Sequence, residues 1–501
     1  MRKIIIDKNH WQTRIAITKE EKLQNIYFYS ALEKSIERIY FKGTITKVLP
    51  GIQTAFVDIG QERAGFLHIS EIDRELAFEK LAGDKIEKKE GPKIKRRPKT
   101  PDIGKILKEG EPILVQVSKE PIYQKGAKLT TCFTLPGRFI VLMPNIPRIG
   151  VSKKIEDREE RARLKELVSK HLPQGMGAII RTTSENKKTK DLSQDIKFLV
   201  ETWKEINKKF KTADPAEKLH EDLPMSLRAV RDHLDDDVNE IIVNDKKEQK
   251  KLYKFVKKIA SEHSHKIKFY KEPPAIFERF EVEKQLEQAL KKKVDLKSGG
   301  SLIIETTEAM TVIDVNTGKF VGKKTLEDTI LKTNLEAAQE VARQLRLRNI
   351  GGLIVIDFID MAIAEHRKQL IRTFEKTLRE TDKFQSVVLK VSEFGLVQMT
   401  RKRSGKTLIQ QLKVCCPNCS GSGTIKSVET ESYAILRELK LQLLEKKVGK
   451  SVELAVNKDI FNHMTSVEYN SILQIEKDLE CSVTLSEDKN LKLNQYKIKK
   501  T

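Results

Sequence analysis

The sequence has few cysteines and no long apolar run, and we expect no secretory leader. Five cysteines in 501 residues form an odd and mostly scattered set, which excludes a disulfide framework. No stretch approaches the ~18 apolar residues that a transmembrane helix needs. The start, residues 1–7, has a basic pair followed by only three apolar residues, too few for a signal peptide. We therefore expect a cytoplasmic protein without a membrane anchor.

Charge is abundant and unbalanced. Charged residues make up 33% of the chain, and 95 Lys and Arg against 72 Asp and Glu give a formal net charge of +23. Such an excess favours a polyanionic partner, because each neutralised phosphate releases counterions. A soluble protein from a lysine-rich proteome would show the same balance, so charge alone leaves nucleic-acid binding open. At roughly 100–200 residues per domain, the length suggests about three to five domains.

The first half of the chain has the alternating pattern of antiparallel strands. Glycines at the turns between the expected strands 40–48, 55–60 and 64–67 predict a small β-barrel of the OB type. In such a barrel, exposed aromatic side chains stack on bases. Residues 85–99 interrupt it with a basic, proline-containing stretch, which is either a loop that contacts RNA or a solvated linker. The strands are expected at 4–6, 13–17 and 25–28, then at 40–48, 55–60 and 64–67, and again at 113–117, 129–143 and 177–181.

The second half alternates helical and strand patterns. Residues 188–258 are helical and heavily charged, interrupted by a strand at 241–243. Thr325 with Asp328 resembles a capping box, and apolar residues then recur on one helical face as far as Leu345. Further strands are expected at 301–305, 310–315, 353–359, 387–391 and 396–400, a further helix at 366–380, and a small α+β tail at 427–501.

Two carboxylates stand at the ends of apolar strands. Asp314 follows Val312-Ile313 and Asp357 follows Val355-Ile356, and burying an unpaired carboxylate there is costly. Asn316 lies two residues after Asp314, so both side chains share one strand face. Oxygen donors from neighbouring strands suit Mg²⁺, and no nearby Cys or His suggests zinc. Strand-end Asp residues in turns are the alternative. Alternation would direct Asp360 to the other face, so we leave it out of the site.

Three long motifs now point to a family. Residues 310–318, 333–348 and 351–361 resemble the ribonuclease E/G family, as does the separation of 43 positions between Asp314 and Asp357. The resemblance covers nearly the whole chain. It implies that Asp314, Asn316 and Asp357 are catalytic and hold Mg²⁺ in a DNase I-like subdomain.

The resemblance also implies a multidomain α+β organisation in which a ribonuclease H-like domain is interrupted. Its first part spans 1–35, followed by an S1 (OB-type) barrel at 36–130 that contains the basic insertion 85–99. A 5′-sensor region at 131–221 comes before the second ribonuclease H-like part at 222–289. The DNase I-like catalytic domain is expected at 290–410, a zinc-link at 411–426 and a small C-terminal α+β domain at 427–501.

Residues that contact RNA are carried over from the same resemblance. Phe56, Phe66 and Lys125 match the S1-barrel contacts, since aromatics stack unpaired bases and Lys meets phosphate. A barrel-core role is the alternative for either Phe.

Gly137, Val141, Arg181 and Thr182 match the pocket for a 5′-monophosphate, and an ordinary surface role is the alternative for Arg181. One departure is Gln385, where relatives carry a basic residue that supports the pocket, so we expect weaker phosphate sensing.

Cys416-Pro417-Asn418-Cys419 resembles half of a zinc knuckle. Because zinc needs four ligands, a second copy of the chain is expected to supply the other two, which gives a zinc-linked homodimer with a homotetramer left open. Cys415 is a further cysteine next to this motif, so zinc ligation within one chain or by a different set of cysteines stays open. Redox chemistry is less expected, because no thioredoxin-like βαβ pattern is seen around the pair. Cys132 and Cys481 are expected to be buried as small apolar residues.

Together these features predict an endoribonuclease that needs Mg²⁺ and carries structural Zn²⁺ between subunits. It would cleave single-stranded, A/U-rich RNA to leave 5′-phosphate and 3′-hydroxyl ends, in rRNA and tRNA maturation and mRNA decay. Length favours the ribonuclease G-like members, without the long arm of ribonuclease E. A non-catalytic RNA-binding protein with a basic surface is the rival hypothesis.

Overall fold

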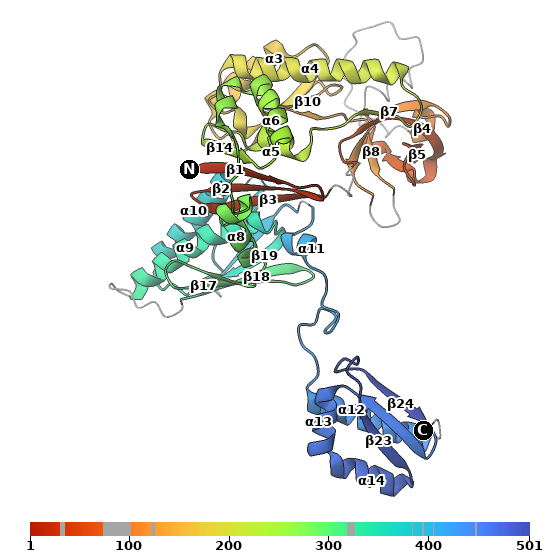
Figure 1. Cartoon of the computed structure of the whole chain (residues 1–501). Coiled ribbons are helices and arrows are strands. Elements are labelled where there is room, and N and C mark those ends of the chain that lie inside the picture. Colours follow the sequence, from red (N-terminus) through yellow and green to blue (C-terminus); the bar gives the residue numbers. More distant parts are fainter. Residues whose placement is uncertain are drawn as a thin grey trace. The chain divides into compact units, whose positions relative to one another are not determined.

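A computed structural model divides the chain into two compact units, Met1–Leu408 and Ile409–Thr501 (Figure 1). The structure describes residues 1–30, 36–73, 102–121, 126–317, 326–382, 384–392, 395–403, 405–445 and 448–500. The basic insertion 85–99, Lys125 and Thr325 lie outside these ranges. Among the helices described, none combines the length and apolar character needed to cross a bilayer. The described residues also form short 3₁₀ turns, η1 (Pro50–Ile52), η2 (Ile69–Glu71), η3 (Thr182–Ser184) and η4 (Ser261–Lys266).

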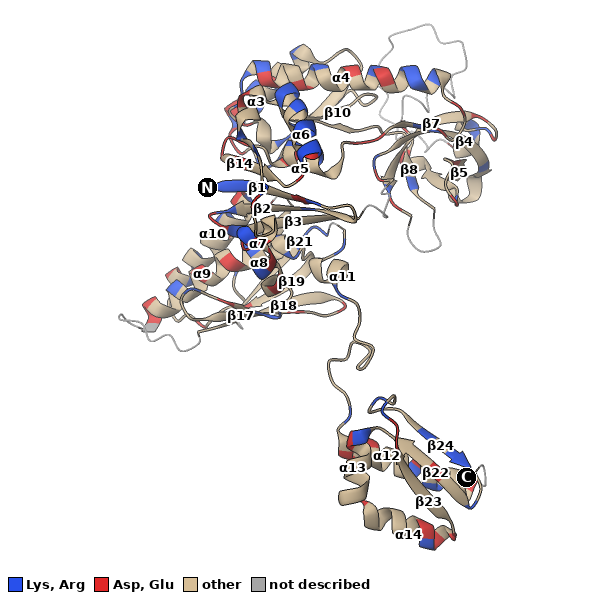
Figure 2. Cartoon of the chain, viewed as in Figure 1, with Lys and Arg blue, Asp and Glu red and all other residues tan. Residues whose placement is uncertain are grey.

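The first sheet joins the start of the chain to a later segment. Its strand order is β15-β14-β1-β2-β3, antiparallel within β1–β3 and parallel between β1, β14 and β15. Alternation along β1 buries Ile4 and Ile6 under α5 and α6, and Ile5 under α7 and α8 on the other face. Lysines make up half of the residues of α6, whose ribbon is largely blue in Figure 2. The elements are β1 (Arg2–Lys8), β2 (Gln12–Lys19), β3 (Lys22–Ser30), β14 (Val238–Val243), β15 (Ile267–Phe269), α5 (Met225–His233), α6 (Lys246–Ile259), α7 (Ile276–Arg279) and α8 (Val282–Ala289).

The predicted small β-barrel is confirmed. One strand, β4, pairs with both β5 and β7, which closes the sheet on itself, and β13 extends it. Inward residues such as Ala55, Val57 and Leu67 form its core with α2. The elements are β4 (Tyr40–Leu49), β5 (Thr54–Asp58), β6 (Gly65–His68), α2 (Ile103–Ile106), β7 (Pro112–Lys119), β8 (Lys128–Thr130) and β13 (Lys218–His220).

A four-stranded sheet of order β11-β12-β10-β9 follows the barrel. Leu164 and Val168 from one helix, and Ile196 and Leu199 from another, pack with Leu142 of this sheet into a single core. The first of these helices, α3, was not among the predicted elements. The elements are β9 (Leu135–Pro136), β10 (Ile140–Met143), β11 (Ile149–Val151), α3 (Arg158–His171), β12 (Gly177–Ile180) and α4 (Thr189–Thr212).

The sheet that carries Asp314 and Asp357 has six strands in the order β16-β17-β18-β19-β21-β20. Its centre is the parallel pair β18–β19, which is joined by the long helix α9. Helices α9 and α10 cover one face, where Ile313, Val315, Ile354 and Ile356 are buried, and the other face stays open. The elements are β16 (Lys293–Asp295), β17 (Ser301–Thr306), β18 (Met310–Asn316), α9 (Leu326–Leu347), β19 (Gly352–Asp357), α10 (Ala364–Thr381), β20 (Ser386–Val388), β21 (Leu396–Arg401) and α11 (Leu408–Leu412).

A buried ion pair fastens the end of α10 to this sheet. The side chains of Asp382 and Arg401 are each about 1% exposed, and Arg401 Nε lies 2.5 Å from Asp382 Oδ2. Arg401 also donates to the carbonyl of Ile350 at 2.5 Å. Lys154, beyond β11, donates to the backbone carbonyl of Asp382. The turn after α10 is therefore anchored both to its own sheet and to the four-stranded sheet region.

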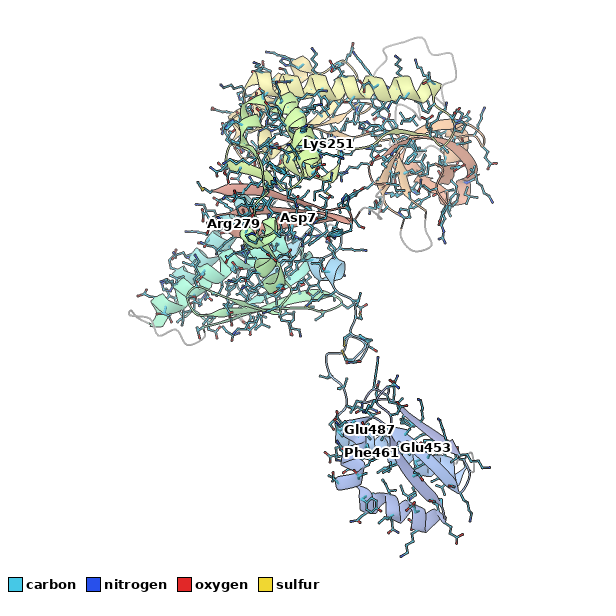
Figure 3. The ribbon with its side chains drawn as sticks, in the orientation of Figure 1. Asp7, Lys251, Arg279, Glu453, Phe461 and Glu487 are labelled. Carbon is cyan, nitrogen blue, oxygen red and sulfur yellow. The ribbon has the colours of Figure 1, made fainter. Side chains whose placement is uncertain are left out.

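The second unit is a three-stranded sheet with helices. Its order is β23-β22-β24, in which β22 and β23 are parallel and are connected through α13 and α14. Leu454 and Val456 pack against Ile460 and Ile435 in its core. Figure 3 labels Glu453 and Glu487 on the sheet and Phe461 on a helix. The elements are α12 (Val428–Leu444), β22 (Ser451–Val456), α13 (Lys458–Ser466), α14 (Tyr469–Leu479), β23 (Ser482–Glu487) and β24 (Tyr496–Lys500).

Candidate active site and RNA-contact residues

The open face of the six-stranded sheet brings the three predicted metal ligands together. Asp314 on β18 and Asp357 on β19 are direct partners in the parallel register. Asn316 follows on the same face, and all three side chains are exposed. Their neighbours Ile313 and Ile356 point into the core, so the alternation that builds the sheet also presents these polar groups to solvent.

Asn316 holds one of the two carboxylates in place. Its Nδ2 donates to Asp314 Oδ2 at 2.8 Å, which leaves the amide oxygen as a further hard donor. Within the described ranges, no three His, Cys, Asp or Glu side chains are grouped as a metal site. The set here has two carboxylates and one amide oxygen. Such a donor set fits Mg²⁺, which keeps several waters, better than it fits zinc.

The two carboxylates repel each other. Partial burial raises the pKa of Asp357 above its ordinary value, and the negative charges of Asp314 and Asp360 raise it further. Asp360 therefore acts on the site, although alternation along the strand had directed it away. The reason is that β19 ends at Asp357, so strand alternation does not extend to residue 360.

A buried side chain fixes the turn that carries Asp360, and sequence reasoning assigned it no role. Asn334 on α9 is fully buried, donates to the carbonyl of Ile359 at 2.8 Å and accepts from its N–H at 3.1 Å. Asn334 stands inside one of the motifs on which the family resemblance rests, which was the only signal available.

In the β-barrel, the two predicted aromatic residues lie side by side. Phe56 on β5 and Phe66 on β6 are direct partners, and both are half-buried. Neither belongs to the barrel core, which is built from their neighbours, so the alternative of a core role is not supported. Lys47 is paired with Phe56 and Lys128 with Phe66, two basic neighbours that sequence reasoning missed. Lys125 lies outside the described residues.

The residues predicted to bind a 5′-monophosphate lie on neighbouring segments of the four-stranded sheet region. Arg181 follows β12, its backbone N–H donates to the carbonyl of Phe139 at 2.8 Å, and its Nη1 donates to the carbonyl of Gly137 at 2.6 Å. Val141 on β10 is paired with Ile179, two residues before Arg181. Thr182 is exposed, with its hydroxyl 3.1 Å from that of Ser152.

Arg181 has an acidic partner that sequence reasoning missed. Asp232 on α5 lies 2.8 Å from Arg181 Nη1 and also contacts Arg231. Burial alone would raise the pKa of Asp232, but the two arginines lower it to about 2. Asp232 therefore stays ionised and orients the Arg181 guanidinium.

The structure also explains the glycine of this pocket. A Cβ at Gly137 would lie 2.5 Å from the carboxylate of Asp195. That buried carboxylate accepts the backbone N–H groups of residues 138, 139 and 140, and its burial raises its pKa. Gly137 thus permits an internal carboxylate to hold the loop.

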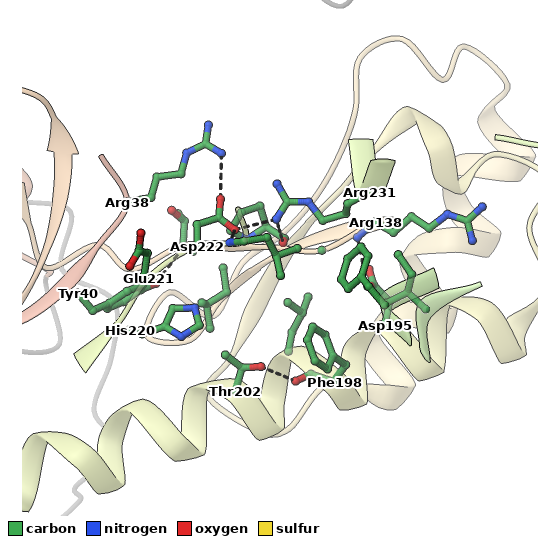
Figure 4. A pocket seen from close by; sticks show the side chains of 18 of the residues that line it. Arg38, Tyr40, Arg138, Asp195, Phe198, Thr202, His220, Glu221, Asp222 and Arg231 are labelled. Atoms are coloured by element: carbon green, nitrogen blue, oxygen red, sulfur yellow. Dashed lines mark hydrogen bonds and ion pairs between the residues drawn. The ribbon is translucent and has the colours of Figure 1, made fainter. Parts of the chain in front are cut away.

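A narrow cavity of about 70 Å³ lies behind this loop (Figure 4). Asp222 in its wall accepts from Arg231 at 3.0 Å and lies 3.6 Å from Arg38. The space suits a few waters and is too small for a nucleotide. The cavity lies where residues of the barrel, α4, α5 and α6 meet.

The cysteine segment, in the second unit, forms a tight turn. Ser420, Gly421 and Gly423 have positive φ values of 49°, 92° and 77°. Hydrogen bonds from the backbone N–H groups of Gly423 and Gly421 lower the pKa of the Cys419 thiol, and the Cys416 side chain contributes. Cys415 and Cys416 are exposed. A stabilised thiolate in an accessible turn is suited to metal ligation.

Removing the neighbouring charge should change the titration of Asp357. In metal-free protein, Asp314→Asn should lower the pKa of Asp357 towards its ordinary value, because the ionised form then meets less repulsion. Asp360→Asn should lower it by a smaller amount, and Asp295→Asn, at the far edge of the sheet, should not change it. Carboxyl ¹³C NMR against pH measures all three. An unchanged pKa in both of the first two variants would contradict the described arrangement.

Sequence patterns of known protein families match three parts of the chain. The sequence pattern of the Ribonuclease E/G family matches residues 134–404, and that of the S1 RNA binding domain matches residues 40–121. A third pattern, RNase E/G, Thioredoxin-like domain, matches residues 415–501. Sequence reasoning expected a small α+β domain in this part of the chain and did not identify it as thioredoxin-like. Cys416 and Cys419 precede α12 and lie outside the β22–α13–α14–β23 connection.

Several curated proteins are similar over most of the chain. Ribonuclease G of Salmonella typhimurium is 39% identical over 436 residues, 87% of each chain. Ribonuclease G of Haemophilus influenzae is 40% identical over 428 residues, 85% of each chain. Ribonuclease E of Escherichia coli is 34% identical over 480 residues, 95% of this chain and 44% of that protein. The chain therefore belongs to the ribonuclease E/G family.

Proposed function

We propose that this chain is a Mg²⁺-dependent endoribonuclease that cuts single-stranded RNA and leaves 5′-phosphate and 3′-hydroxyl ends. Endoribonuclease activity in RNA processing follows from family membership. The metal, the strand preference and the product ends are the proposal. The observation that carries it is the register that sets Asp314 opposite Asp357 on an open sheet face.

Three side chains on the open sheet face have distinct roles in metal binding. Asp314, Asp357 and the amide oxygen of Asn316 would hold the ion. A bound Mg²⁺ supplies Lewis-acid chemistry, polarising a phosphoryl oxygen and lowering the pKa of water. Asn316 keeps the Asp314 carboxylate oriented through its 2.8 Å hydrogen bond. The Asp357 and Asp314 carboxylates repel each other, and binding a cation would relieve that repulsion.

Removing either carboxylate should abolish cleavage and spare RNA binding. Asp314→Asn and Asp357→Asn keep the side-chain shape but lose the negative charge that holds the cation. Replacing a residue that only hydrogen-bonds to a metal ligand typically lowers activity by roughly 10–100-fold. Replacing a ligand itself should lower the cleavage rate by more than that. Cleavage of a fluorescent oligonucleotide and gel-shift affinity measure the two properties, with Asp295→Asn as control. Cleavage at the wild-type rate by either variant would refute the ligand assignment. Lack of cleavage by the wild type would favour the non-catalytic rival.

We further propose that the barrel holds single-stranded, A/U-rich substrate. Phe56 and Phe66 offer adjacent half-buried rings, and Lys47 stands beside Phe56 in the strand register. Aromatic faces stack unpaired bases and lysines meet phosphates. The family resemblance adds rRNA and tRNA precursors and mRNA in the cytoplasm as the proposed substrates.

The region around Arg181 is proposed to bind a 5′-monophosphate. Asp232 and the carbonyl of Gly137 hold one guanidinium nitrogen, so Arg181 is oriented before the ligand arrives. Thr182 contributes an exposed hydroxyl next to it. Gln385 is exposed, and its neutral side chain adds no cation, which supports weaker sensing.

The phosphate proposal predicts a preference that depends on Arg181. Wild-type protein should cleave a 5′-monophosphorylated oligonucleotide faster than its 5′-hydroxyl form. Arg181→Gln should reduce that ratio by about tenfold or bring it to one, because a charge-assisted hydrogen bond contributes roughly 1.5 kcal/mol. Arg148→Gln, an exposed arginine of the same region, serves as control. Equal ratios in wild type and Arg181→Gln would exclude the pocket.

The cysteine turn is proposed to hold zinc between two copies of the chain. Cys416 and Cys419 supply two thiolates, and the backbone N–H groups of Gly421 and Gly423 support Cys419. Four ligands would come from two turns. Cys415, also exposed, is the remaining candidate ligand.

The zinc proposal predicts one ion for every two chains. The double variant Cys416→Ser with Cys419→Ser should lose the zinc and show a lower mass by light scattering. Cys481→Ser, in the same unit, should keep the zinc content and the mass of the wild type. Cys415→Ser should also keep its zinc if Cys416 and Cys419 are the ligands, and should lose it if Cys415 is a ligand. Zinc content and mass unchanged in the double variant would refute the shared site.

A further inference from the structure

Helix α6 carries a concentration of lysine that its own stability does not explain. Its exposed residues include Lys246, Lys247, Lys250, Lys251, Lys254, Lys257 and Lys258 (Figures 2 and 3, where Lys251 is labelled). Lysines four residues apart repel each other on a helix. Lysines in the first turn also oppose the helix dipole.

These charges are not neutralised by neighbouring acids. Glu248, the acidic residue within α6, is buried and faces inward, where it contacts Lys8 and the hydroxyl of Ser226. Across the described part of the chain, none of the seven α6 lysines forms an ion pair within 4.0 Å. The ammonium of Lys258 lies 4.5 Å from the centre of the Phe198 ring. The face is therefore a positive surface open to an external anion.

The lysines are arranged in rows with an aromatic residue among them. Lys246, Lys250, Tyr253 and Lys257 follow one another at four- and three-residue spacing, which places them along one side of the helix. This row is about 17 Å long at 1.5 Å per residue. Tyr253 is 46% exposed. Basic side chains interleaved with an exposed aromatic ring favour a single-stranded nucleic acid over a smooth anionic surface.

We propose that this lysine face of α6 is a docking surface for the sugar-phosphate backbone of single-stranded RNA outside the strand that is being cut. The occupant is RNA because the family acts on RNA and because the charge of the surface complements phosphate. The surface belongs to the helix layer over β1 and β14, whereas the candidate metal ligands lie on the open face of a different sheet. The proposal goes beyond the cleavage site, the barrel and the phosphate pocket.

The test replaces four lysines and keeps the helix. A variant with Lys246→Gln, Lys250→Gln, Lys254→Gln and Lys257→Gln is compared with a matched control of equal charge change. The control carries Lys458→Gln, Lys477→Gln, Lys489→Gln and Lys492→Gln, all exposed residues of the second unit. Affinity for a long single-stranded RNA with a 5′-hydroxyl is measured against salt in EDTA. These conditions remove metal chemistry and the 5′-phosphate, so the outcome does not depend on the proposed cleavage mechanism.

The α6 variant should bind at least tenfold more weakly at low salt, with the slope of log affinity against log salt reduced by about 3 if all four contact phosphates. The control should stay close to wild type, and Tyr253→Ala should weaken binding without changing the slope. Cleavage of a short oligonucleotide should be unaffected in all variants. An unchanged slope and affinity in the α6 variant, or an equal loss in the control, would overturn the proposal. The proposal would also be overturned if the α6 variant lost binding to anionic phosphatidylglycerol vesicles but kept its affinity for RNA.

Discussion

The parallel pairing of β18 with β19 is the constraint on which the rest of the structure depends. Its register sets Asp314 directly opposite Asp357, while Ile313 and Ile356 on the same strands fill the core under α9 and α10. A slip of one residue in either strand would turn its carboxylate into the apolar layer and expose its isoleucine. Hydrophobic burial therefore fixes the position of the carboxylates, and the geometry of the site follows from the packing that holds the sheet together.

Hydrogen bonds and ion pairs between residues far apart in the sequence hold the turns next to the β18–β19 pair, in addition to the packing of the core. Asn334 fixes the turn after β19 through two hydrogen bonds to Ile359. The buried Asp382–Arg401 pair fixes the turn after α10, and Lys154 connects that turn to the region of Arg181. Removing one partner of such a buried pair costs roughly 3–5 kcal/mol, because it leaves an uncompensated charge. The contacts of Asp382 thus connect the sheet that carries the candidate site with the segment after β11.

Much of this arrangement could be predicted from the sequence, because strand alternation and helical periodicity are local. The pattern around Asp314 and Asp357 indicated both strands, and spacing alone placed Asn316 beside Asp314. The choice of Asp232 as partner of Arg181 could not be predicted, since the two residues lie 51 positions apart and meet only in the fold. Asp360 was misplaced because sequence does not show where a strand ends. The thioredoxin-like character of the last unit was missed because its outer strands β23 and β24 are largely polar and half-exposed, so that only β22 has the pattern of a buried strand.

The most direct test of the account is the position of a bound cation. Mn²⁺ can replace Mg²⁺ at oxygen-rich sites, and its anomalous X-ray scattering locates it independently of any assumption about ligands. In crystals of the full chain grown with Mn²⁺, the account predicts a peak within coordination distance of carboxylate oxygens of both Asp314 and Asp357. A peak at other residues, or contact with only one of these two carboxylates, would contradict it.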